Sequence, residues 1–421
     1  MTVSMASDAR TREDREAPGA RTDLVLVANA RMPSQRAQSV QLARAAHAFE
    51  ACGARTVLVH ARRRGTPAQP AGEVWRALST AASDGPSGAE RRAPGLVAAP
   101  CLDWIDAVPR RLQYVPARLQ EWTFGRSAAR IVRARFGGAL VLARDVEVAH
   151  ALAGRGRVGM EIHRVPGGAT RRRWLLDAVH AGVPVVAISG GVLEDLIEIG
   201  VPADRVLVEH DAYDPALEDE LPARADARAR LGLDADRPVV LYAGGLLRWK
   251  GVDVLVDAAR SGALGSALVV VVGGMDRDVD ELRARSAGLE NVRVDGFRPA
   301  HDVPAYLAAA DVGVVPNRAT PRISSHHTSP LKVFEAMAAR LPLVVSDLPS
   351  LRDVLEPDEA TFVPPEDPAA LAEGIRALLD DAVARHDVAA RAYEAVRGRT
   401  WEARARRILA FLQQAARGGA A

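Results

Sequence analysis

A lysine and a glutamate stand one helical turn apart in SPLKVFEAMAAR, near the end of this 421-residue chain. Ser329 predicts an N-cap, Pro330 the first helical position, and the apolar spacing a helix that continues to about Arg340. The unpaired N–H groups of such a helix start attract phosphate, and Lys332 in the first turn adds a positive charge. Glu335 can accept two hydrogen bonds from a ribose. An ordinary capped helix with a Lys–Glu pair is the alternative.

Lysine is rare elsewhere in the chain. Of 55 basic residues only two are lysines, and the other one is Lys250, which follows the glycine pair Gly244–Gly245. A compact ammonium group on a flexible stem suits a phosphate, whereas arginine favours fork-shaped contacts. The retention of lysine at these two positions therefore indicates a phosphate site, unless both merely survived codon drift.

Charge is divided unevenly along the chain. Residues 1–205 hold 29 basic and 20 acidic residues, a net charge of +9, and the remainder holds 26 and 33, a net charge of −7. Such a division indicates that the first half meets an anionic partner, although a solvated basic surface would look the same. Nothing in the pattern points to nucleic acid.

The composition points to a cytoplasmic protein. Cys52 and Cys101 cannot build a disulfide framework, no Cys/His cluster has zinc spacing, and no apolar run has transmembrane length. The polar, mixed-charge residues 1–21 predict a disordered lead rather than a secretory signal.

Alternating short apolar runs and amphipathic segments predict an α/β chain with two doubly wound, Rossmann-like parallel sheets. The expected divisions are a first domain at 22–205, a linker at 206–236, a second domain at 237–398 and a final helix at 399–421. The stretch 65–100, rich in Ala, Pro, Gly and Ser, predicts an outward loop. Expected strands are 23–29, 56–60, 139–143, 158–162 and 183–188 in the first domain, then 239–243, 268–272, 292–294, 312–315, 343–346 and 361–363.

The residues with special chemistry follow the strands of the second domain. Ligands of open parallel sheets bind at the carboxyl ends of the strands. After the first strand come the glycine pair, Arg248 and Lys250; after the second comes Gly274; after the fourth comes the loop into HHTSPLK. We therefore expect both lysines, a helix start and a carboxylate to meet at one edge, where a diphosphate joined to a ribose would fit. The pattern lacks the G-x-x-x-x-G-K-[ST] of a P-loop.

The combined motifs VVLYAGGLLRWKGVDVLVDAA and SPLKVFEAMAARLPLVVSDLPSLRDVL resemble the donor half of family 4 of the retaining GT-B glycosyltransferases. VLARD, EIH and TWEARARRILAFL are similar to that family as well. The resemblance implies a nucleotide-sugar donor in the second domain, an acceptor in the first, a cleft between them and a final helix that crosses back to the first domain. No cofactor is implied beyond the UDP- or GDP-linked sugar that serves as co-substrate.

The resemblance also implies roles for individual residues. Lys250 matches the lysine that neutralises the donor diphosphate, and Glu335 the glutamate that binds the ribose. Phe297 lies where a loop usually brackets the base. The remaining donor-binding candidates are Gly244, Gly245, Arg248, Gly274, Ser329, Pro330, Leu331 and Lys332, and the acceptor-binding candidates are Arg36, Ser39 and Arg144.

Two positions depart from the family pattern. The family usually has a glutamate eight residues before Glu335, where this chain has His327, and often an arginine where this chain has Gly245. His327 is therefore a catalytic candidate in place of the usual acid, and Arg248 is the residue that could compensate for Gly245.

The expected reaction is a metal-independent hexosyl transfer to a hydroxyl group on the face that the leaving group vacates. Lys250, Lys332, Arg248 and helix amides would stabilise the leaving diphosphate. His163, at the end of a first-domain strand, would orient or deprotonate the acceptor hydroxyl, unless it is only structural. Asp276, Asp278 and Asp280 occupy a predicted helix start and are not expected to hold a metal.

The acceptor would be a glycan, a glycolipid or a small molecule, as in cell-surface polysaccharide or glycoconjugate synthesis. The basic first domain would also admit a polyprenyl-diphosphate-linked sugar at the inner membrane face, with arginines in peripheral contact with anionic lipid. Two alternatives share the donor site: a GT-B sugar-nucleotide epimerase, and a degenerate nucleotide-binding scaffold without transferase activity.

Overall fold

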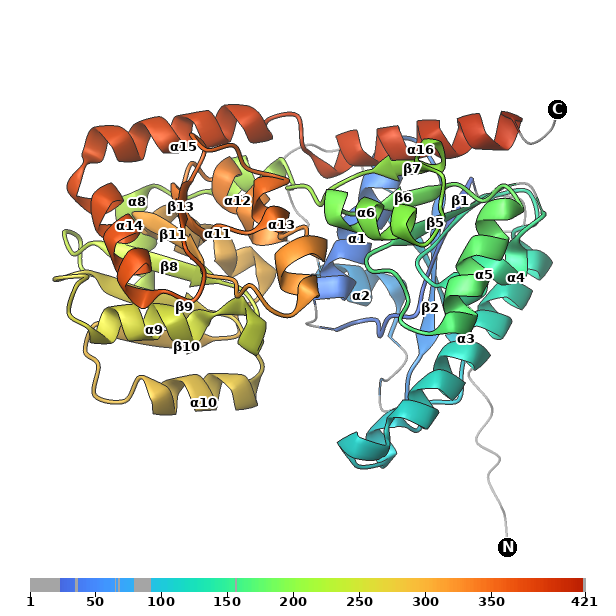
Figure 1. Ribbon diagram of the computed structural model, residues 1–421, viewed down its shortest axis with the longest axis horizontal. Coiled ribbons are helices and arrows are strands. Elements are labelled where there is room, and N and C mark those ends of the chain that lie inside the picture. Colours follow the sequence, from blue (N-terminus) through green and yellow to red (C-terminus); the bar gives the residue numbers. More distant parts are fainter. Residues whose placement is uncertain are drawn as a thin grey trace, which may run out of the picture.

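The computed structural model describes residues 23–34, 37–64, 66, 69–78, 92–155 and 157–418. Two parallel β-sheets, each covered by helices on both faces, lie side by side (Figure 1). This arrangement is the two-domain GT-B architecture that the sequence predicts. The expected disordered lead and Arg36 fall outside the described residues.

The first sheet has seven parallel strands in the order β3-β2-β1-β4-β5-β6-β7. Its strands are β1 (Leu24–Ala28), β2 (Thr56–Arg62), β3 (Gly95–Pro100), β4 (Leu140–Ala143), β5 (Val158–Ile162), β6 (Val185–Ala187) and β7 (Val206–Val208). Its helices are α1 (Ala37–Ala51), α2 (Ala71–Leu78), α3 (Tyr114–Arg135), α4 (Val146–Leu152), α5 (Ala169–His180) and α6 (Gly190–Glu198).

Strand periodicity assigns the two faces of this sheet. Val25 and Val27 join a buried cluster with α3, α4, α5 and α6, whereas Leu24 and Leu26 join a second cluster with α1, α2 and the last helix of the chain. Successive side chains of a strand point to opposite faces, so a wholly apolar strand serves two cores at once.

The second sheet has six parallel strands in the order β10-β9-β8-β11-β12-β13. They are β8 (Val239–Ala243), β9 (Leu268–Val272), β10 (Val292–Gly296), β11 (Val312–Val315), β12 (Leu343–Ser346) and β13 (Thr361–Val363). The helices are α7 (Ala216–Glu220), α8 (Arg224–Leu231), α9 (Val252–Arg260), α10 (Asp276–Arg285), α11 (Val303–Ala309), α12 (Leu331–Ala338), α13 (Pro349–Arg352), α14 (Pro368–Asp380) and α15 (Ala382–Val396). All six strands lie where the apolar runs predict them.

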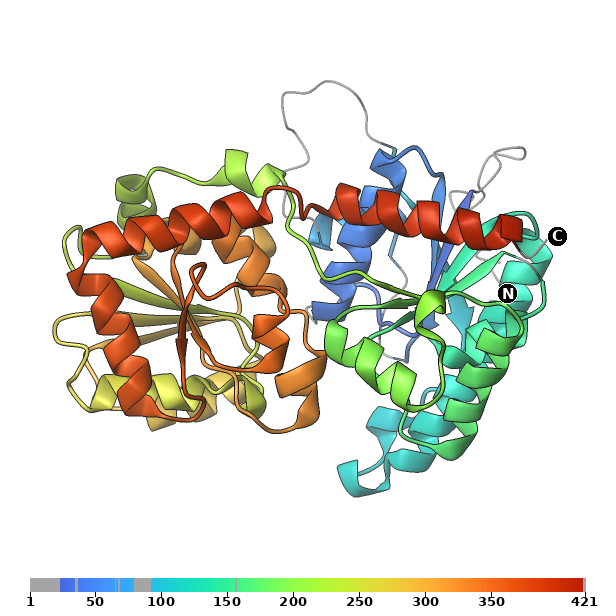
Figure 2. The same ribbon diagram turned by 45° about the horizontal axis from the view of Figure 1, so that its top comes forward.

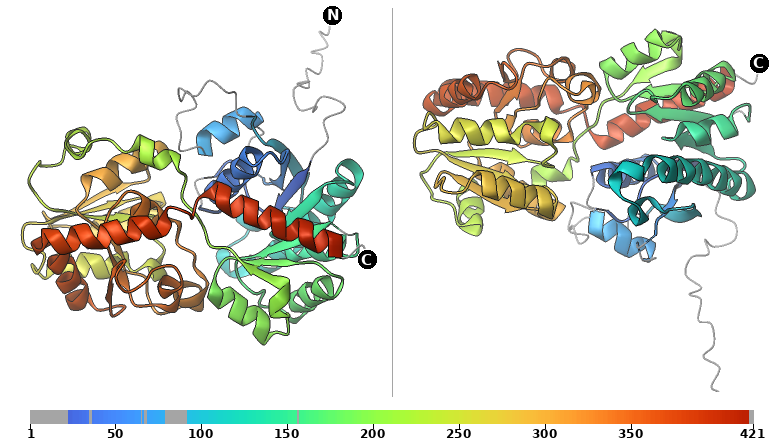
Figure 3. Two further views of the ribbon diagram at one scale, coloured as in Figure 1. Left: turned by 90° about the horizontal axis from the view of Figure 1, so that it is seen from above. Right: turned by 60° about the horizontal axis from the view of Figure 1, so that its bottom comes forward.

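The last helix, α16 (Trp401–Gly418), leaves the second domain and packs on the first. Figures 2 and 3 show α15 and α16 running end to end across both domains. Trp401, Ile408 and Leu412 are buried against the first sheet. A Cβ on Gly159 of β5 would lie 2.2 Å from a Leu412 methyl group, so the glycine allows the helix to approach the strand.

Three expectations about the elements differ from the structure. Residues 65–100 are not only a loop, since they contain α2 and β3. Residues 206–208, assigned from the sequence to the linker, form β7 of the first sheet. Helix α12 ends at Ala338 rather than Arg340, whose φ of 53° is left-handed. Short, Gly- and Pro-flanked segments carry too little periodicity to reveal strands that tertiary pairing completes.

Candidate functional site

The candidate donor site lies where the order of the second sheet reverses. β8 and β11 are neighbours, but the chain leaves β8 toward β9 on one side and leaves β11 toward β12 on the other. Loops that follow such a pair of strands diverge and leave a crevice at their carboxyl ends. The loop after β8 carries Gly244 to Lys250, and the loop after β11 leads into α12.

Lys332 places a buried amino group at this edge of the sheet. Its Nζ atom is shielded from solvent, has no hydrogen-bond partner among the residues that the structure describes, and lies 4.3 Å from the ring centre of Tyr242. Burial lowers the pKa of Lys332 well below its usual value, and the charge of Lys250 lowers it further. The two lysines therefore lie close enough to repel each other, as a pair that awaits a shared anion would.

The turn that carries Lys250 is fixed against the loop after β11. Residues 248–250 form one turn of 3-10 helix, and the Trp249 carbonyl accepts a hydrogen bond from the Arg318 amide at 2.8 Å. Gly251 follows with a φ of 66°, and a Cβ there would lie 1.9 Å from the Pro316 carbonyl oxygen. Only glycine permits this approach. Burial lowers the pKa of Lys250 as well.

The start of α12 is not capped as the sequence predicts. Pro330 occupies the N-cap position and no side chain caps the helix, which begins at Leu331. The Ser329 hydroxyl instead accepts a hydrogen bond from the Asp211 amide at 2.7 Å, so the serine ties the linker to the site. The expectation of a Ser329 cap is wrong because a tertiary partner takes its oxygen. The helix start consequently keeps unpaired amide groups for a ligand.

Tyr242 and Gly244 lie beside the Lys332 side chain. The Tyr242 hydroxyl donates a hydrogen bond to the Gly245 carbonyl at 2.7 Å and so holds the glycine loop. A Cβ on Gly244 would lie 3.8 Å from Cδ of Lys332. Gly244 therefore borders the lysine directly, and the next residue, Gly245, is exposed.

Glu335, the expected ribose ligand, already has a partner in this structure. Its Oε1 accepts a hydrogen bond from Nη1 of Arg44 at 2.8 Å, and both side chains are largely buried. Arg44 lies on α1 of the first domain, so this ion pair bridges the two domains. A ribose that binds Glu335 would have to share or displace the guanidinium group.

The other donor candidates form a looser set. Arg248 and Gly245 are exposed, Leu331 is half-buried, and Phe297 is 38% exposed at the end of β10. Gly274 follows β9 in a left-handed conformation and faces Leu246. Leu331 begins α12, and the other four residues come from the loops after β8, β9 and β10.

His327 is placed differently from an acid that contacts a sugar. It is buried, and its Nε2 lies 2.7 Å from Oδ2 of Asp195 on α6 of the first domain. Arg322 pairs with the same carboxylate. Burial lowers the pKa of His327, while Asp195 acts in the opposite direction. In this conformation His327 thus belongs to a contact between the domains, and only its Nδ1 lacks a partner among the described residues.

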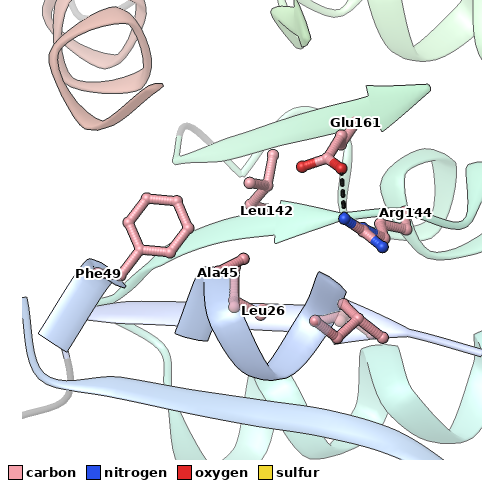
Figure 4. Close-up of a pocket in the computed structure, with 8 residues that line it drawn as sticks. Leu26, Ala45, Phe49, Leu142, Arg144 and Glu161 are labelled. Carbon is pink, nitrogen blue, oxygen red and sulfur yellow. Dashed lines mark ion pairs between the residues drawn. The ribbon is translucent and has the colours of Figure 1, made fainter. Parts of the chain in front are cut away.

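A buried charge cluster surrounds Glu161 on β5 of the first sheet. Glu161 of β5 accepts ion pairs from Arg144 at 2.7 Å and Arg404 at 3.5 Å, and His163 contacts it at 2.6 Å. Figure 4 shows Arg144 and Glu161 lining a small pocket between α1 and the sheet, with Phe49 on its other wall. Arg404 comes from α16, so the crossing helix supplies part of the cluster.

The cluster settles the protonation of His163. Burial alone would raise the pKa of Glu161, but Arg144 and Arg404 hold it well below its usual value. The ionised Glu161 can only accept, so Nε2 of His163 carries the proton and Nδ1 keeps its lone pair. Burial, followed by the charge of Arg144, lowers the pKa of His163. A neutral imidazole in this tautomer can accept a proton or orient a hydroxyl group through Nδ1.

Of the two acceptor candidates that the structure describes, Arg144 belongs to this cluster. Ser39 is buried and donates its hydroxyl proton to the Arg31 carbonyl at 2.9 Å, which makes it a structural tie on α1. The Ser39 hydroxyl is therefore buried and already engaged. Arg144 and His163 both contact Glu161.

Four residues of the site are missing from the sequence-based set: Glu161, Arg404, Arg44 and Tyr242. Glu161 had a signal, because an acid inside the apolar strand VGMEI is costly to bury unless it is paired. The two arginines had none, since each contacts its carboxylate across more than two hundred positions of the chain.

Comparison with known proteins agrees with this geometry. Residues 223–395, which include the second sheet and most of its helices, match the model of the family Glycosyl transferases group 1. More than nine tenths of the chain superposes on solved structures of the same two-domain fold. The Anabaena protein HepE, solved with UDP and glucose, has a TM-score of 0.68 at 18% identity and covers 93% of this chain and 100% of its own. Sucrose-phosphate synthase of Thermosynechococcus elongatus has a TM-score of 0.71 at 21% identity, with coverage of 94% and 99%.

Several of the proteins that match by sequence are named glycosyltransferases. A D-inositol 3-phosphate glycosyltransferase of Catenulispora acidiphila is 34% identical over 251 residues, 56% of this chain and 58% of that protein. An alpha-D-kanosaminyltransferase of Streptomyces kanamyceticus is 29% identical over 199 residues, 45% and 49% of the two chains. The chain thus matches about half the length of these relatives.

Proposed function

We propose that this protein is a retaining glycosyltransferase of family 4, which moves a hexosyl group from a nucleotide-diphosphate sugar to an acceptor hydroxyl. One observation carries the proposal: Lys250 and Lys332 lie near each other beside an uncapped helix start at the switch point of the second sheet, and the buried Nζ of Lys332 has no acceptor among the described residues. Glu335 lies one turn further along that helix, within reach of a ribose. A diphosphate attached to a nucleoside would satisfy all these groups.

In the proposed reaction, the bond between the anomeric carbon and the diphosphate oxygen breaks, and the diphosphate leaves with the electron pair. Lys250, Lys332 and the amides at the start of α12 stabilise the developing charge. The acceptor oxygen bonds to the anomeric carbon on the same face, and its proton passes to the diphosphate or to Nδ1 of His163. Arg144 and Arg404 act through Glu161, which holds the imidazole in the required tautomer.

The proposal includes metal independence, since the lysines would supply the positive charge that a cation supplies elsewhere. It also includes a glycan, glycolipid or small-molecule acceptor, in cell-surface polysaccharide or glycoconjugate synthesis. Support for such a role is limited to the names of relatives, among them a putative teichuronic acid biosynthesis glycosyltransferase of Bacillus subtilis, 30% identical over 173 residues.

The test is calorimetric titration with UDP and GDP, followed by product analysis with the UDP- or GDP-sugars that bind. Wild-type protein should bind one nucleotide and transfer its sugar with retained configuration. Lys250→Ala should abolish transfer and leave the circular dichroism spectrum unchanged; near-normal turnover in this variant would defeat the assignment. Epimerised donor without acceptor would favour the epimerase alternative, and binding of neither nucleotide would favour the degenerate scaffold.

A further inference from the structure

Exposed apolar side chains gather on one part of the first domain. Of the eleven large hydrophobic residues that are exposed in the described chain, six fall between positions 102 and 122. They are Leu102, Trp104, Leu112, Tyr114, Val115 and Trp122, with exposed fractions of 44, 52, 59, 73, 69 and 42%. We call this set the α3 face. Exposed apolar residues are usually scattered singly over a protein surface. A group of them in one place is typical of an interaction surface.

The amino-terminal half of α3 presents these rings in register with arginines. Tyr114, Arg118, Trp122 and Arg126 follow one another at intervals of four residues and so lie along one side of the helix. The Arg118 guanidinium lies 5.5 Å from the Tyr114 ring centre, and that of Arg126 lies 4.2 Å from the Trp122 ring centre. The opposite side, with Phe124 and Ala128, is buried against the sheet. Figures 1 and 2 show this end of α3 projecting beyond the body of the domain.

A basic pocket adjoins the α3 face. It is lined by Arg62, Arg63 and Arg64 from the end of β2 and by residues 101–104, which follow β3 and include Trp104. Arg63 is paired with the buried Asp103 at 3.4 Å. Neither Arg62 nor Arg64 forms an ion pair within the part of the chain that the structure describes, and both are exposed. The pocket therefore carries uncompensated positive charge.

Acidic groups do little to offset this charge. Asp106 is occupied by Arg31 at 3.0 Å, and Glu121 is shared between Arg118 at 2.8 Å and Arg171 at 3.8 Å. The surface thus combines exposed Trp and Tyr rings with a surplus of arginine. Rings of this kind partition into the headgroup region of a bilayer, and the arginines around them attract anionic lipid.

We propose that the α3 face and the arginines beside it dock the protein onto an anionic lipid surface. A second copy of the chain is a poor occupant, because a two-fold interface would place the same positive surface against itself. The docking is peripheral: no described helix has the length and apolar character needed to span a bilayer. Binding of this kind depends on the exposed aromatic rings and on the charges of the arginines.

The effect of docking on catalysis, unlike the docking itself, rests on the proposed function. β2 and β3 end at the docking surface, and they belong to the same carboxyl edge of the sheet as Arg144 and His163. Docking would therefore bring the acceptor side of the cleft to the membrane, where a lipid-linked acceptor would be found. The surface itself is defined without reference to the donor site.

The experiment is flotation of the full chain with vesicles of neutral phosphatidylcholine and with vesicles that also contain phosphatidylglycerol. Wild-type protein should float only with the anionic vesicles, and tryptophan fluorescence should shift to the blue on binding. The double variant Arg62→Gln/Arg64→Gln should bind about 30-fold more weakly, from about fivefold for each arginine. Tyr114→Ser/Val115→Ser should weaken binding at least tenfold. Val383→Ser/Met275→Ser, which removes two apolar side chains exposed elsewhere, should bind like the wild type.

Three outcomes would overturn the docking proposal: no flotation with either vesicle, equal flotation with both, or vesicle-free dimers that the Tyr114→Ser/Val115→Ser change dissolves. The nucleotide titration is run on the same samples, so the two proposals can fail separately. Nucleotide binding without flotation removes only the docking surface. Flotation without nucleotide binding removes only the proposed transferase.

Discussion

Lys332 offers the sharpest test of the donor site, because removing its charge should have opposite effects on stability and on binding. In the free protein its Nζ is buried next to Lys250, with no hydrogen-bond acceptor within the described ranges. A buried donor left unsatisfied costs about 1–3 kcal/mol. The change Lys332→Met keeps the length of the side chain and removes that cost. The free energy of unfolding of the unliganded variant should therefore rise by about 1–3 kcal/mol.

Binding should change in the other direction. A charge-assisted hydrogen bond contributes about 1.5–3 kcal/mol, which corresponds to about a 10- to 150-fold increase in the dissociation constant when the ammonium is lost. The assays are denaturant unfolding of the free protein and calorimetric titration with UDP, GDP and inorganic pyrophosphate. Pyrophosphate isolates the phosphate contacts from those of the ribose and base. Arg277→Met, an exposed position on α10, is the matched control and should change neither quantity.

The same charge should make the stability of the free protein depend on pH. Burial lowers the pKa of Lys332 well below 10.5, so at pH values between the folded and unfolded pKa the unfolded chain binds more protons. Stability should therefore rise with pH through that window, and this contribution should disappear in Lys332→Met. Diphosphate binding at alkaline pH should take up a proton, which titration in buffers of different ionisation enthalpy measures.

One result would refute this reasoning. If Lys332→Met lowers the stability of the free protein and binds UDP, GDP and pyrophosphate as the wild type does, Lys332 packs structurally against Tyr242 and does not await an anion. The convergence of the two lysines would then lose its functional meaning.

Three further predictions concern the rest of the site. Arg44→Ala should free the Glu335 carboxylate for the ribose and tighten nucleoside diphosphate binding about tenfold in calorimetry, from a charged hydrogen bond that contributes about 1.5 kcal/mol; weaker binding would mean that Arg44 itself contacts the donor. Arg404→Met removes a charge that lowers the pKa of His163, so the acid limb of the kcat profile should move to higher pH with little change in the donor KM, and Arg404→Lys should restore part of it. An unmoved limb would reduce Arg404 to a packing role. Transfer should be unaffected by EDTA; loss of activity that Mg²⁺ restores would contradict the proposed metal independence.

The sequence is enough to predict most of the fold. Apolar runs such as 239–243 and 268–272 alternate with helical segments, and buried parallel strands are the structure that satisfies this pattern. The final helix predicted at 399–421 is present as α16 (Trp401–Gly418), and the Thr400 hydroxyl accepts a hydrogen bond from the Ala403 amide at 3.2 Å. Strand β3 and helix α2 were not predicted, because their sequences are short and rich in Gly, Pro and Ala.

The candidate site divides in the same way. Spacing alone places Lys250, Lys332 and Glu335 at one edge of the second sheet, because local sequence determines where strands end and parallel strands end together. The sequence by itself therefore determined which groups could hold a phosphate. It could not show that the Lys332 Nζ lies over Tyr242 with no hydrogen-bond acceptor among the described residues, or that Ser329 binds the Asp211 amide instead of capping its helix.

Only the tertiary structure decided the partners that come from other parts of the chain. Arg44 pairs with Glu335 across 291 positions, His327 with Asp195 across 132, and Arg404 reaches Glu161 from a helix that crosses between the domains. No local periodicity encodes such pairs, since they depend on how two separately formed domains and the returning helix pack together. Strands and helices are determined by neighbours in the sequence, whereas the charges of a buried site are determined by neighbours in space.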